Sequence, residues 1–401
     1  MILARTVFCL GLGQLISWGI SYYLIGVFGE AIAAEFGWGR DVVYGGFALA
    51  LLVMGATSSL VGRLIDRHGG RKVMIAGSLL IAASCAGLAL CRGLPGYFAA
   101  SACLGLAMRL TLYDAAFAAL VRIAGPAARG PIAQITLLGG LASSVFWPLG
   151  HVLAGHFGWR GALLVYAGIA LATIPLHLAT PNHRLEDAPT RNATPQPAPL
   201  AVSRRDLALA GGLFALITTL ANFLNAAMSS QMIVILSGLG LALSASVWIA
   251  TLRGIGQSLA RLCEVLFGRR VPPVALNLFA CALMPLAFVA GLFSGASSAA
   301  AMTFAFVYGA MNGLLTITRG TLPLVLFDHR TYGSFVGRLI APSFIVSAAA
   351  PLVYAIVIAR FGEAAALYVS IAIAVLAAFA AWLLALLCKG LERKSVPAFE
   401  A

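Results

Sequence analysis

Long apolar runs recur along this chain at short intervals, and each is close to the length of about 20 residues that spans a bilayer as a helix. A soluble protein of this size needs roughly a quarter of its residues charged to cover its surface. Here only 10% of the residues are charged and 61% are hydrophobic. The sequence therefore predicts a polytopic membrane protein and excludes a soluble one.

The apolar runs predict an all-α membrane protein with twelve transmembrane helices. The first run is long and continues past the length of a signal peptide, so we interpret it as a retained helix. The twelve predicted spans are 7–29, 42–62, 73–91, 96–121, 133–156, 161–179, 207–236, 241–266, 274–294, 298–327, 334–358 and 364–388.

One hydrophilic segment interrupts the regular spacing of the runs. Residues 180–206 are rich in Pro, Ala and charge, which is typical of a flexible linker. The linker separates six spans from six spans. The predicted organisation is an N-terminal six-helix bundle (1–179), a cytoplasmic linker (180–206), a C-terminal six-helix bundle (207–388) and a cytoplasmic tail (389–401).

The basic residues predict the orientation of the chain. With both termini inside the cell, 18 of the 26 Lys and Arg residues fall in inner segments and 4 in outer loops. Such a bias is the usual signal of topology. It also accounts for the net charge of +13, and the bases are too dispersed to form a nucleic-acid-binding surface. We expect a multi-pass protein of the cell (inner) membrane in contact with lipid.

The sequence offers no pattern for a metal, a cofactor or an enzyme. Its 7 cysteines lie in or at the ends of spans without the paired spacing of a zinc or redox site. They are interpreted as small apolar residues. No nucleophile elbow, phosphate loop or catalytic carboxylate pair is present, so we expect no catalytic residues, no metal and no cofactor.

A charged stretch after the second span has a partner in the second half. The sequence "RLIDRHGGRKV" (63–73) matches "RLCEVLFGRRV" (261–271) at a constant offset of 198 without a gap. Two further segments repeat: 156–166 resembles 360–369, and "LTLYD" (110–114) resembles "LTITR" (315–319). These matches indicate an internal duplication, and hence two pseudo-symmetric bundles.

The first copy carries a family resemblance. Residues 62–72, "GRLIDRHGGRK", resemble the loop signature of the major facilitator superfamily, G-x-L-x-D-R-x-G-R-K/R, with one residue inserted before the basic pair. Residues 22–40 also resemble the first helix of its monocarboxylate and oxalate/formate branch. The resemblance implies the twelve-helix fold, alternating access, and an Asp that braces the neighbouring helix when the cytoplasmic side is closed.

A cytoplasmic gate follows from the resemblance and from the repeat. The second copy places its charged residues where the first copy has the signature, so a gate or brace is expected there, with substrate or proton binding as the alternative. The predicted gate residues are Gly62, Asp66, Arg67, Arg71, Arg261 and Glu264.

Polar stripes lie on helices that, by the resemblance, line the central cavity: spans one, four, seven and ten. Small polar residues can instead serve helix packing, but stripes occur on three of these four spans at helical spacing. Gln14, Ser17, Trp18, Ser21 and Tyr22 form the first, and Thr218 and Ser229 belong to that of span seven. The predicted substrate-binding residues are Arg319, Arg253, Asn312, Thr316, Asn222, Asn225, Gln14, Tyr22 and Tyr113.

Two charges of span four are candidates for proton coupling. Arg109 begins "RLTLYDAA", which resembles the family's R-x-x-x-G-x-G pattern with Tyr113 and Ala115 in place of the glycines. An Arg that snorkels to a helix end is the alternative. The repeat aligns Asp114 with Arg319, which suggests a salt bridge that opens on substrate or proton binding, or else a static pair.

These features predict a secondary transporter of a small organic anion, proton-coupled or working by exchange. Arg253 and Arg319 within spans, without a matching excess of acids, suit a carboxylate. The alternative is a proton-driven drug or metabolite exporter, although residues 139–155 lack the Gly-Pro spacing of exporters. A channel, a sensor or a membrane enzyme fits less well. The expected partners are a small anion, a proton and lipid, and the protein is expected to be a monomer.

Overall fold

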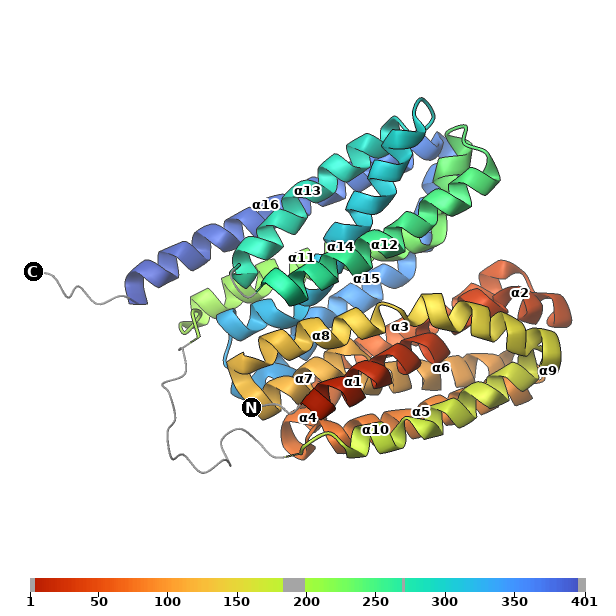
Figure 1. The fold of residues 1–401 in the computed structure, drawn as a ribbon, viewed down its shortest axis with the longest axis horizontal. Coiled ribbons are helices and arrows are strands. Elements are labelled where there is room, and N and C mark those ends of the chain that lie inside the picture. Colours follow the sequence, from red (N-terminus) through yellow and green to blue (C-terminus); the bar gives the residue numbers. More distant parts are fainter. Residues whose placement is uncertain (1–3, 183–198, 269–270, 396–401) are drawn as a thin grey trace, which may run out of the picture. The chain divides into compact units, whose positions relative to one another are not determined.

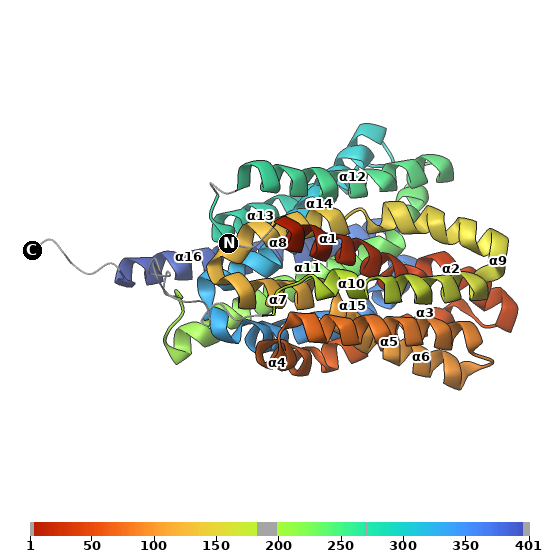
Figure 2. The ribbon, with the colours of Figure 1, turned by 60° about the horizontal axis from the view of Figure 1, so that its bottom comes forward.

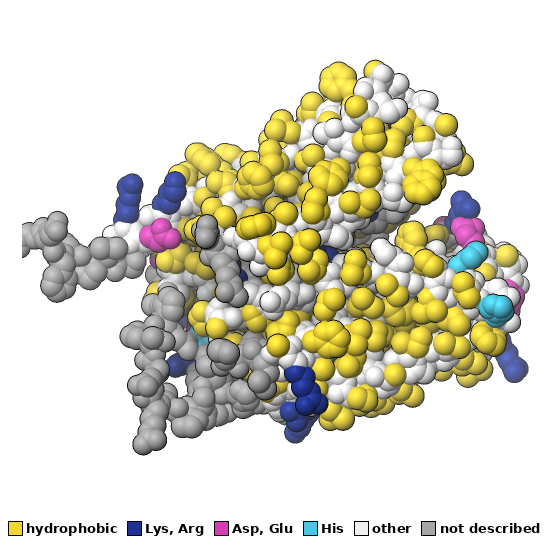
Figure 3. Space-filling view, in the orientation of Figure 1, with side chains coloured by type: hydrophobic (Ala, Val, Ile, Leu, Met, Phe, Trp, Pro, Cys, Tyr) yellow, Lys and Arg dark blue, Asp and Glu magenta, His cyan; other side chains and the backbone are white. Residues whose placement is uncertain are grey.

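A computed structural model of the chain describes residues 4–182, 199–268 and 271–395, which contain helices and their connections but no strand. Eight helical segments within these ranges are long and apolar enough to cross a membrane, or nine if a bent pair counts as one. Apolar side chains cover most of the helix sides in Figure 3, and most charged ones lie toward the helix ends. The predicted all-α membrane fold is confirmed.

The number of passages follows from the breaks between helices. The longest apolar segment, Leu94–Leu178, has positive φ at Gly125 (52°) and Gly158 (67°), and these breaks match the predicted ends of spans four and five. The bent pair Arg40–Ala56 and Ser58–His68, with an angle of 51°, corresponds to span two. Span eight is not among these segments, and its helix contains Arg253, Arg261 and Glu264. The described residues are thus consistent with twelve passages.

Contacts divide the chain into two compact units. The first comprises Met1–Thr194 and His329–Ala348, and the second Pro195–Asp328 and Ala349–Ala401. The predicted linker and tail lie partly outside the described residues, so the predicted domain boundaries stay a prediction. In both views the long helices of each unit run alongside one another (Figures 1 and 2).

The first unit begins with a helix whose middle is a π-helical turn, Trp18–Tyr22, between two α-helices. The helices of this unit follow the predicted spans one to six. They are α1 (Ala4–Ser17), α2 (Leu24–Phe36), α3 (Arg40–Ala56), α4 (Ser58–His68), α5 (Gly70–Leu90), α6 (Leu94–Thr111), α7 (Tyr113–Ala124), α8 (Arg129–Gly139), α9 (Ala142–Ala172) and α10 (Ile174–Leu178), with short 3-10 turns at Gly125–Ala128 and His329–Thr331.

The second unit has longer and less interrupted helices. Ser203 caps the first of them, since its Oγ accepts a hydrogen bond of 3.1 Å from Asp206 N. Gly362, with φ of 82°, separates the fifth helix of this unit from the sixth and last one. The helices are α11 (Arg204–Gly238), α12 (Leu243–Phe267), α13 (Pro273–Leu292), α14 (Ser298–Leu326), α15 (Tyr332–Phe361), whose first part packs in the first unit, and α16 (Glu363–Ser395).

Helix packing repeats between the two units. In the first, α6 packs against α3 and α5, and α5 against α9; in the second, α14 packs against α12 and α13, and α13 against α16. Glycines permit the closest of these approaches. A Cβ at Gly105 of α6 would lie 2.1 Å from Ala50 O of α3, and one at Gly309 of α14 would lie 2.0 Å from Arg253 O of α12. Small residues at membrane helix crossings allow such backbone contact, and the duplication is thus visible in the packing.

We predict that Gly105→Val destabilises the first unit, because the added side chain has only backbone to displace. Overpacking of this kind costs about 1–3 kcal/mol. Gly168→Val is the matched control, since a Cβ there meets no atom within 4 Å. Thermal unfolding in detergent checks the difference, and equal melting temperatures for the two variants would contradict the role assigned to the α3–α6 crossing.

Candidate functional site

Asp66 stands at the first turn of α15 within the first unit. Its Oδ1 accepts a hydrogen bond from Gly333 N (3.0 Å) and its Oδ2 one from Ser334 N (2.7 Å). A carboxylate is stabilised there, because the first N–H groups of a helix have no partner in the helix itself. Gly62 makes the approach possible, since a Cβ there would lie 1.9 Å from Gly333 O.

The rest of the charged connector, residues 62–73, is tied to the end of span six. Arg71 Nε donates to Thr180 O at 2.6 Å, and Asn182 Nδ2 donates to His68 O at 3.1 Å. Arg122 of α7 donates to both segments, at 3.0 Å to Asn182 O and 3.3 Å to Asp66 O. The connector, the end of span six and the start of α15 therefore form one hydrogen-bonded assembly, and a gate formed by it stays a prediction.

The other predicted gate residues are Arg67, Arg261 and Glu264. Arg67 is exposed at the end of α4. Arg261 and Glu264 lie on α12 of the second unit with exposed fractions of 2% and 8%. Glu264 is next to Gly268, where a Cβ would lie 1.8 Å from its Oε2. Their gate role is also a prediction.

We predict that Gly62→Leu and Asp66→Ala separate the connector from α15. The first adds a side chain where only a backbone fits, and the second removes both acceptors. The measurement is the maleimide labelling rate of Ser334→Cys, in a variant without the native cysteines. We expect a clear rise in both variants and none in Arg63→Ala, because Arg63 is an exposed neighbour that donates to Ser59 Oγ of its own helix. An unchanged rate in Gly62→Leu would contradict the proposed docking.

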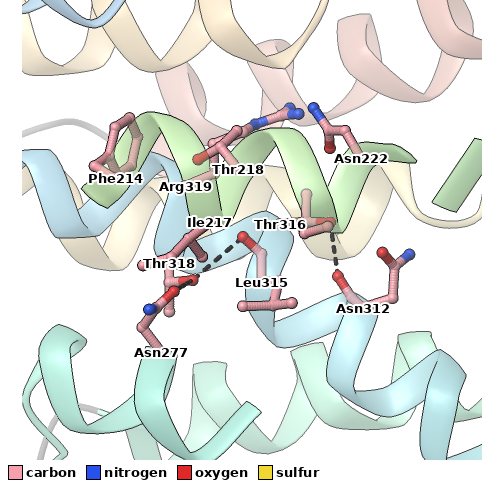
Figure 4. A pocket seen from close by; sticks show the side chains of 11 residues that line it. Phe214, Ile217, Thr218, Asn222, Asn277, Asn312, Leu315, Thr316, Thr318 and Arg319 are labelled. Carbon is pink, nitrogen blue, oxygen red and sulfur yellow. Dashed lines mark hydrogen bonds between the residues drawn. The ribbon is translucent and has the colours of Figure 1, made fainter. Parts of the chain in front are cut away.

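A pocket lies between α11, α13 and α14 of the second unit. Figure 4 shows that Asn312, Thr316 and Arg319 of α14 present one face to it, and Thr218 and Asn222 come from α11. Thr316 Oγ1 donates to Asn312 O at 2.9 Å, and Thr318 Oγ1 to Asn277 Oδ1 at 3.1 Å. The pocket offers neutral hydrogen-bonding groups beside one guanidinium.

Arg253 lies on α12 of the same unit, where its side chain contacts α11 and α14. Its Nη2 donates to Asn225 Oδ1 (2.6 Å) and to Ser229 Oγ (2.9 Å), and its guanidinium lies 5.6 Å from the ring centre of Tyr308. Asn312 Nδ2 donates to the same Asn225 oxygen at 3.0 Å. Within the described residues no carboxylate lies within 4 Å of Arg253. The cation is therefore held by neutral groups alone.

The structure thus brings together six of the nine predicted substrate-binding residues. Asn222, Asn312, Thr316 and Arg319 line the pocket, and Asn312 connects it to Asn225 and Arg253. Tyr308 was missed by the sequence interpretation. It lies four residues before Asn312, so the stripe of span ten extended by one turn would have found it. The pocket residues Asn277 and Thr318 carry no comparable signal.

The other three predicted binding residues lie in the first unit around Trp18. Its ring centre is 4.8 Å from that of Tyr22 and 4.9 Å from that of Tyr113. Gln14 is fully buried and its Nε2 donates to Thr111 O at 2.7 Å. The π-helical turn at Trp18–Tyr22 is of a kind frequent at functional sites, and no sequence pattern had indicated it.

The candidate proton-coupling residues lie on opposite sides of a helix break. Leu112 has extended backbone (φ −73°, ψ −177°) and separates α6 from α7. Arg109, before the break, donates to Ser58 Oγ (2.9 Å) and Ser58 O (3.2 Å). Asp114 is 8% exposed in the first turn of α7, where the helix dipole favours a carboxylate. Arg109 thus contacts α4, beside the connector.

Comparisons with known proteins agree with the fold. The family model of the Major Facilitator Superfamily matches residues 10–338. Two solved structures cover 94% of this chain: the human organic anion transporter MFSD10 (TETRAN), with a TM-score of 0.67, 18% identity and 99% of that chain covered, and the proton:xylose symporter XylE, with 0.75, 12% and 95%. At these identities they show the fold alone.

Curated relatives match part of the chain. Monocarboxylate transporter 4 of Mus musculus and that of Rattus norvegicus are each 29% identical over 167 residues, which is 40% of this chain and 34% of those proteins. The match thus spans about a third of the relatives' length. The chain belongs to the Major Facilitator Superfamily and is a multi-pass membrane transporter, not an enzyme.

Proposed function

We propose that this transporter carries a small organic anion with a carboxylate-like group by alternating access, coupled to a proton or by exchange. The observation that carries the proposal is the environment of Arg253. Its guanidinium is half-buried in a predicted membrane span, and among the described residues it contacts neutral acceptors and an aromatic ring but no carboxylate. A cation in such a position is costly unless it serves a pathway or meets an opposite charge, and a carboxylate would supply that charge.

Further observations support an anion. Arg319 lines a pocket next to this cluster, together with amide and hydroxyl groups that can hold carboxylate oxygens. Arginine suits such a ligand, because its planar fork donates two parallel hydrogen bonds. The curated relative that matches part of the chain is a monocarboxylate transporter, which agrees in kind. The proposed site therefore contains Arg253, Arg319, Asn312, Thr316, Asn222 and Asn225 in the second unit.

A drug or metabolite exporter is the second candidate. The cluster of Trp18, Tyr22 and Tyr113 favours it, because aromatic faces bind apolar or cationic cargo. For the anion carrier, Gln14, Tyr22 and Tyr113 are proposed as the substrate-binding residues of the first unit. We also propose an inner-membrane location with both termini cytoplasmic, from the distribution of basic residues, and a monomeric state.

We predict that small carboxylates raise the melting temperature of the purified protein. The panel is acetate, succinate, oxalate and benzoate at several pH values, with bulky organic cations for comparison. Arg319→Ala and Arg253→Gln are expected to abolish the shift, since each removes a guanidinium worth about 1.5–3 kcal/mol as a charged hydrogen-bond donor. Arg92→Ala, which changes an exposed Arg between α5 and α6, is the control. Stabilisation by bulky cations only would support the exporter instead.

We predict that Asp114→Asn abolishes proton coupling but preserves exchange. The proposal is that Asp114 takes up the coupled proton, and the amide cannot be protonated in its place. Liposomes measure both activities: uptake driven by a pH gradient should be lost, and substrate counterflow should remain. Uptake that still follows the gradient would refute the assignment of Asp114.

A further inference from the structure

Asn225 of α11 supplies a single oxygen that is shared by two donors from two other helices. Arg253 Nη2 of α12 donates to it at 2.6 Å and Asn312 Nδ2 of α14 at 3.0 Å. An amide oxygen has two acceptor positions, so the Asn225 oxygen is fully used. One atom thus links α11, α12 and α14 at the cation of the proposed site.

The position of this oxygen is that of a carboxylate oxygen bound to the guanidinium. A carboxylate is the stronger acceptor, because a charge-assisted hydrogen bond is roughly twice as strong as a neutral one. Ser229 Oγ occupies a second position on the same nitrogen at 2.9 Å. The cation is therefore satisfied by two weak neutral acceptors that a charged oxygen can displace.

Tyr308 supplies an independent sign of a ligand. The residue is fully buried, and its hydroxyl has no hydrogen-bond partner within the described part of the chain. A buried hydroxyl without a partner is unfavourable. Arg253 lies over the ring that carries this hydroxyl. A ligand oxygen bound to the guanidinium would therefore lie near the Tyr308 hydroxyl, a donor that lacks an acceptor among the described residues.

We propose that Asn225 is an internal stand-in for the transported anion, which competes with it for Arg253 and thereby reports whether the site is occupied. This inference rests on the proposed function. When the anion takes Nη2, it displaces both Ser229 and the Asn225 oxygen, which keeps Asn312, so the link from α11 to α12 opens while that from α11 to α14 remains. When the anion leaves, Asn225 closes the link again. Asn225 is a positioning residue that acts through Arg253.

The first test converts the stand-in into a permanent anion. In Asn225→Asp a carboxylate takes the place of the amide oxygen beside Arg253. The apparent Kd is measured by thermal shift with the carboxylate of the panel that stabilises the natural protein most. We expect it to rise about tenfold or more, without loss of melting temperature in the absence of ligand. Ser237→Asp is the matched control, because it adds the same charge to α11 at a side chain that donates to Val234 O of its own helix.

The second test removes the stand-in. In Asn225→Ala the anion meets no amide competitor, so the apparent KM and Kd should fall several-fold. The maximal rate of counterflow should also fall, because only the weaker acceptor Ser229 Oγ remains for Arg253 when the anion leaves. A purely structural role predicts the opposite for binding: weaker affinity and lower stability in both Asn225 variants. This variant also decides the question if Asn225→Asp does not fold.

The outcomes separate this inference from the proposed function. If no carboxylate stabilises the natural protein, or if Arg253→Gln binds as the natural protein does, the proposed function fails at this site and the inference fails with it. If Arg253→Gln loses binding while Asn225→Asp binds with unchanged Kd, or Asn225→Ala binds more weakly, the inference alone is overturned. A higher apparent Kd in Asn225→Asp together with a lower apparent Kd in Asn225→Ala supports the inference.

Discussion

The backbone contact between α12 and α14 is the constraint on which the candidate site depends. Gly256, Gly309 and Gly313 have no room for a Cβ, because carbonyl oxygens of the facing helix lie 2.2, 2.0 and 2.7 Å from where it would be. With the two helices this close, Arg253 of α12 lies over Tyr308 of α14. A larger residue at Gly309 would displace Arg253 itself, since the carbonyl it approaches is that of Arg253.

Three charges inside the two units make hydrogen bonds to neutral dipoles. Arg109 donates to the hydroxyl and carbonyl of Ser58, Arg253 to an amide and a hydroxyl, and Asp66 accepts from two backbone N–H groups. Dipoles of this kind compensate the loss of water without fixing a counter-ion in place. A transporter benefits from that arrangement, because a cation held by weak acceptors remains available to an anionic substrate, and a helix start held by one carboxylate can be released.

Several elements could be predicted from the sequence because a local pattern determines them. The apolar runs predicted the spans, and the duplicated charged stretch predicted two related bundles, which the repeated packing of α3, α6, α12 and α14 now shows. The polar stripe on span ten predicted that Asn312, Thr316 and Arg319 share a face, as helical spacing requires. The resemblance of residues 62–72 to the family signature led to Asp66, which contacts α15 by bonds to residues 267 and 268 positions away.

The sequence by itself therefore determined that the chain lies in a lipid bilayer, the number of helices it favours, the internal duplication and which residues share a helix face. These properties follow from hydropathy and helical period. Only the tertiary structure decided which oxygen serves which cation: that Asn225 is shared by Arg253 and Asn312, that Arg109 meets Ser58, and that a π-helical turn brings Trp18 to Tyr113. The reason is physical. Hydrogen-bond partners on different helices depend on helix rotation and on distances of a few tenths of an ångström, which are set by how glycines let backbones approach and not by spacing along one helix.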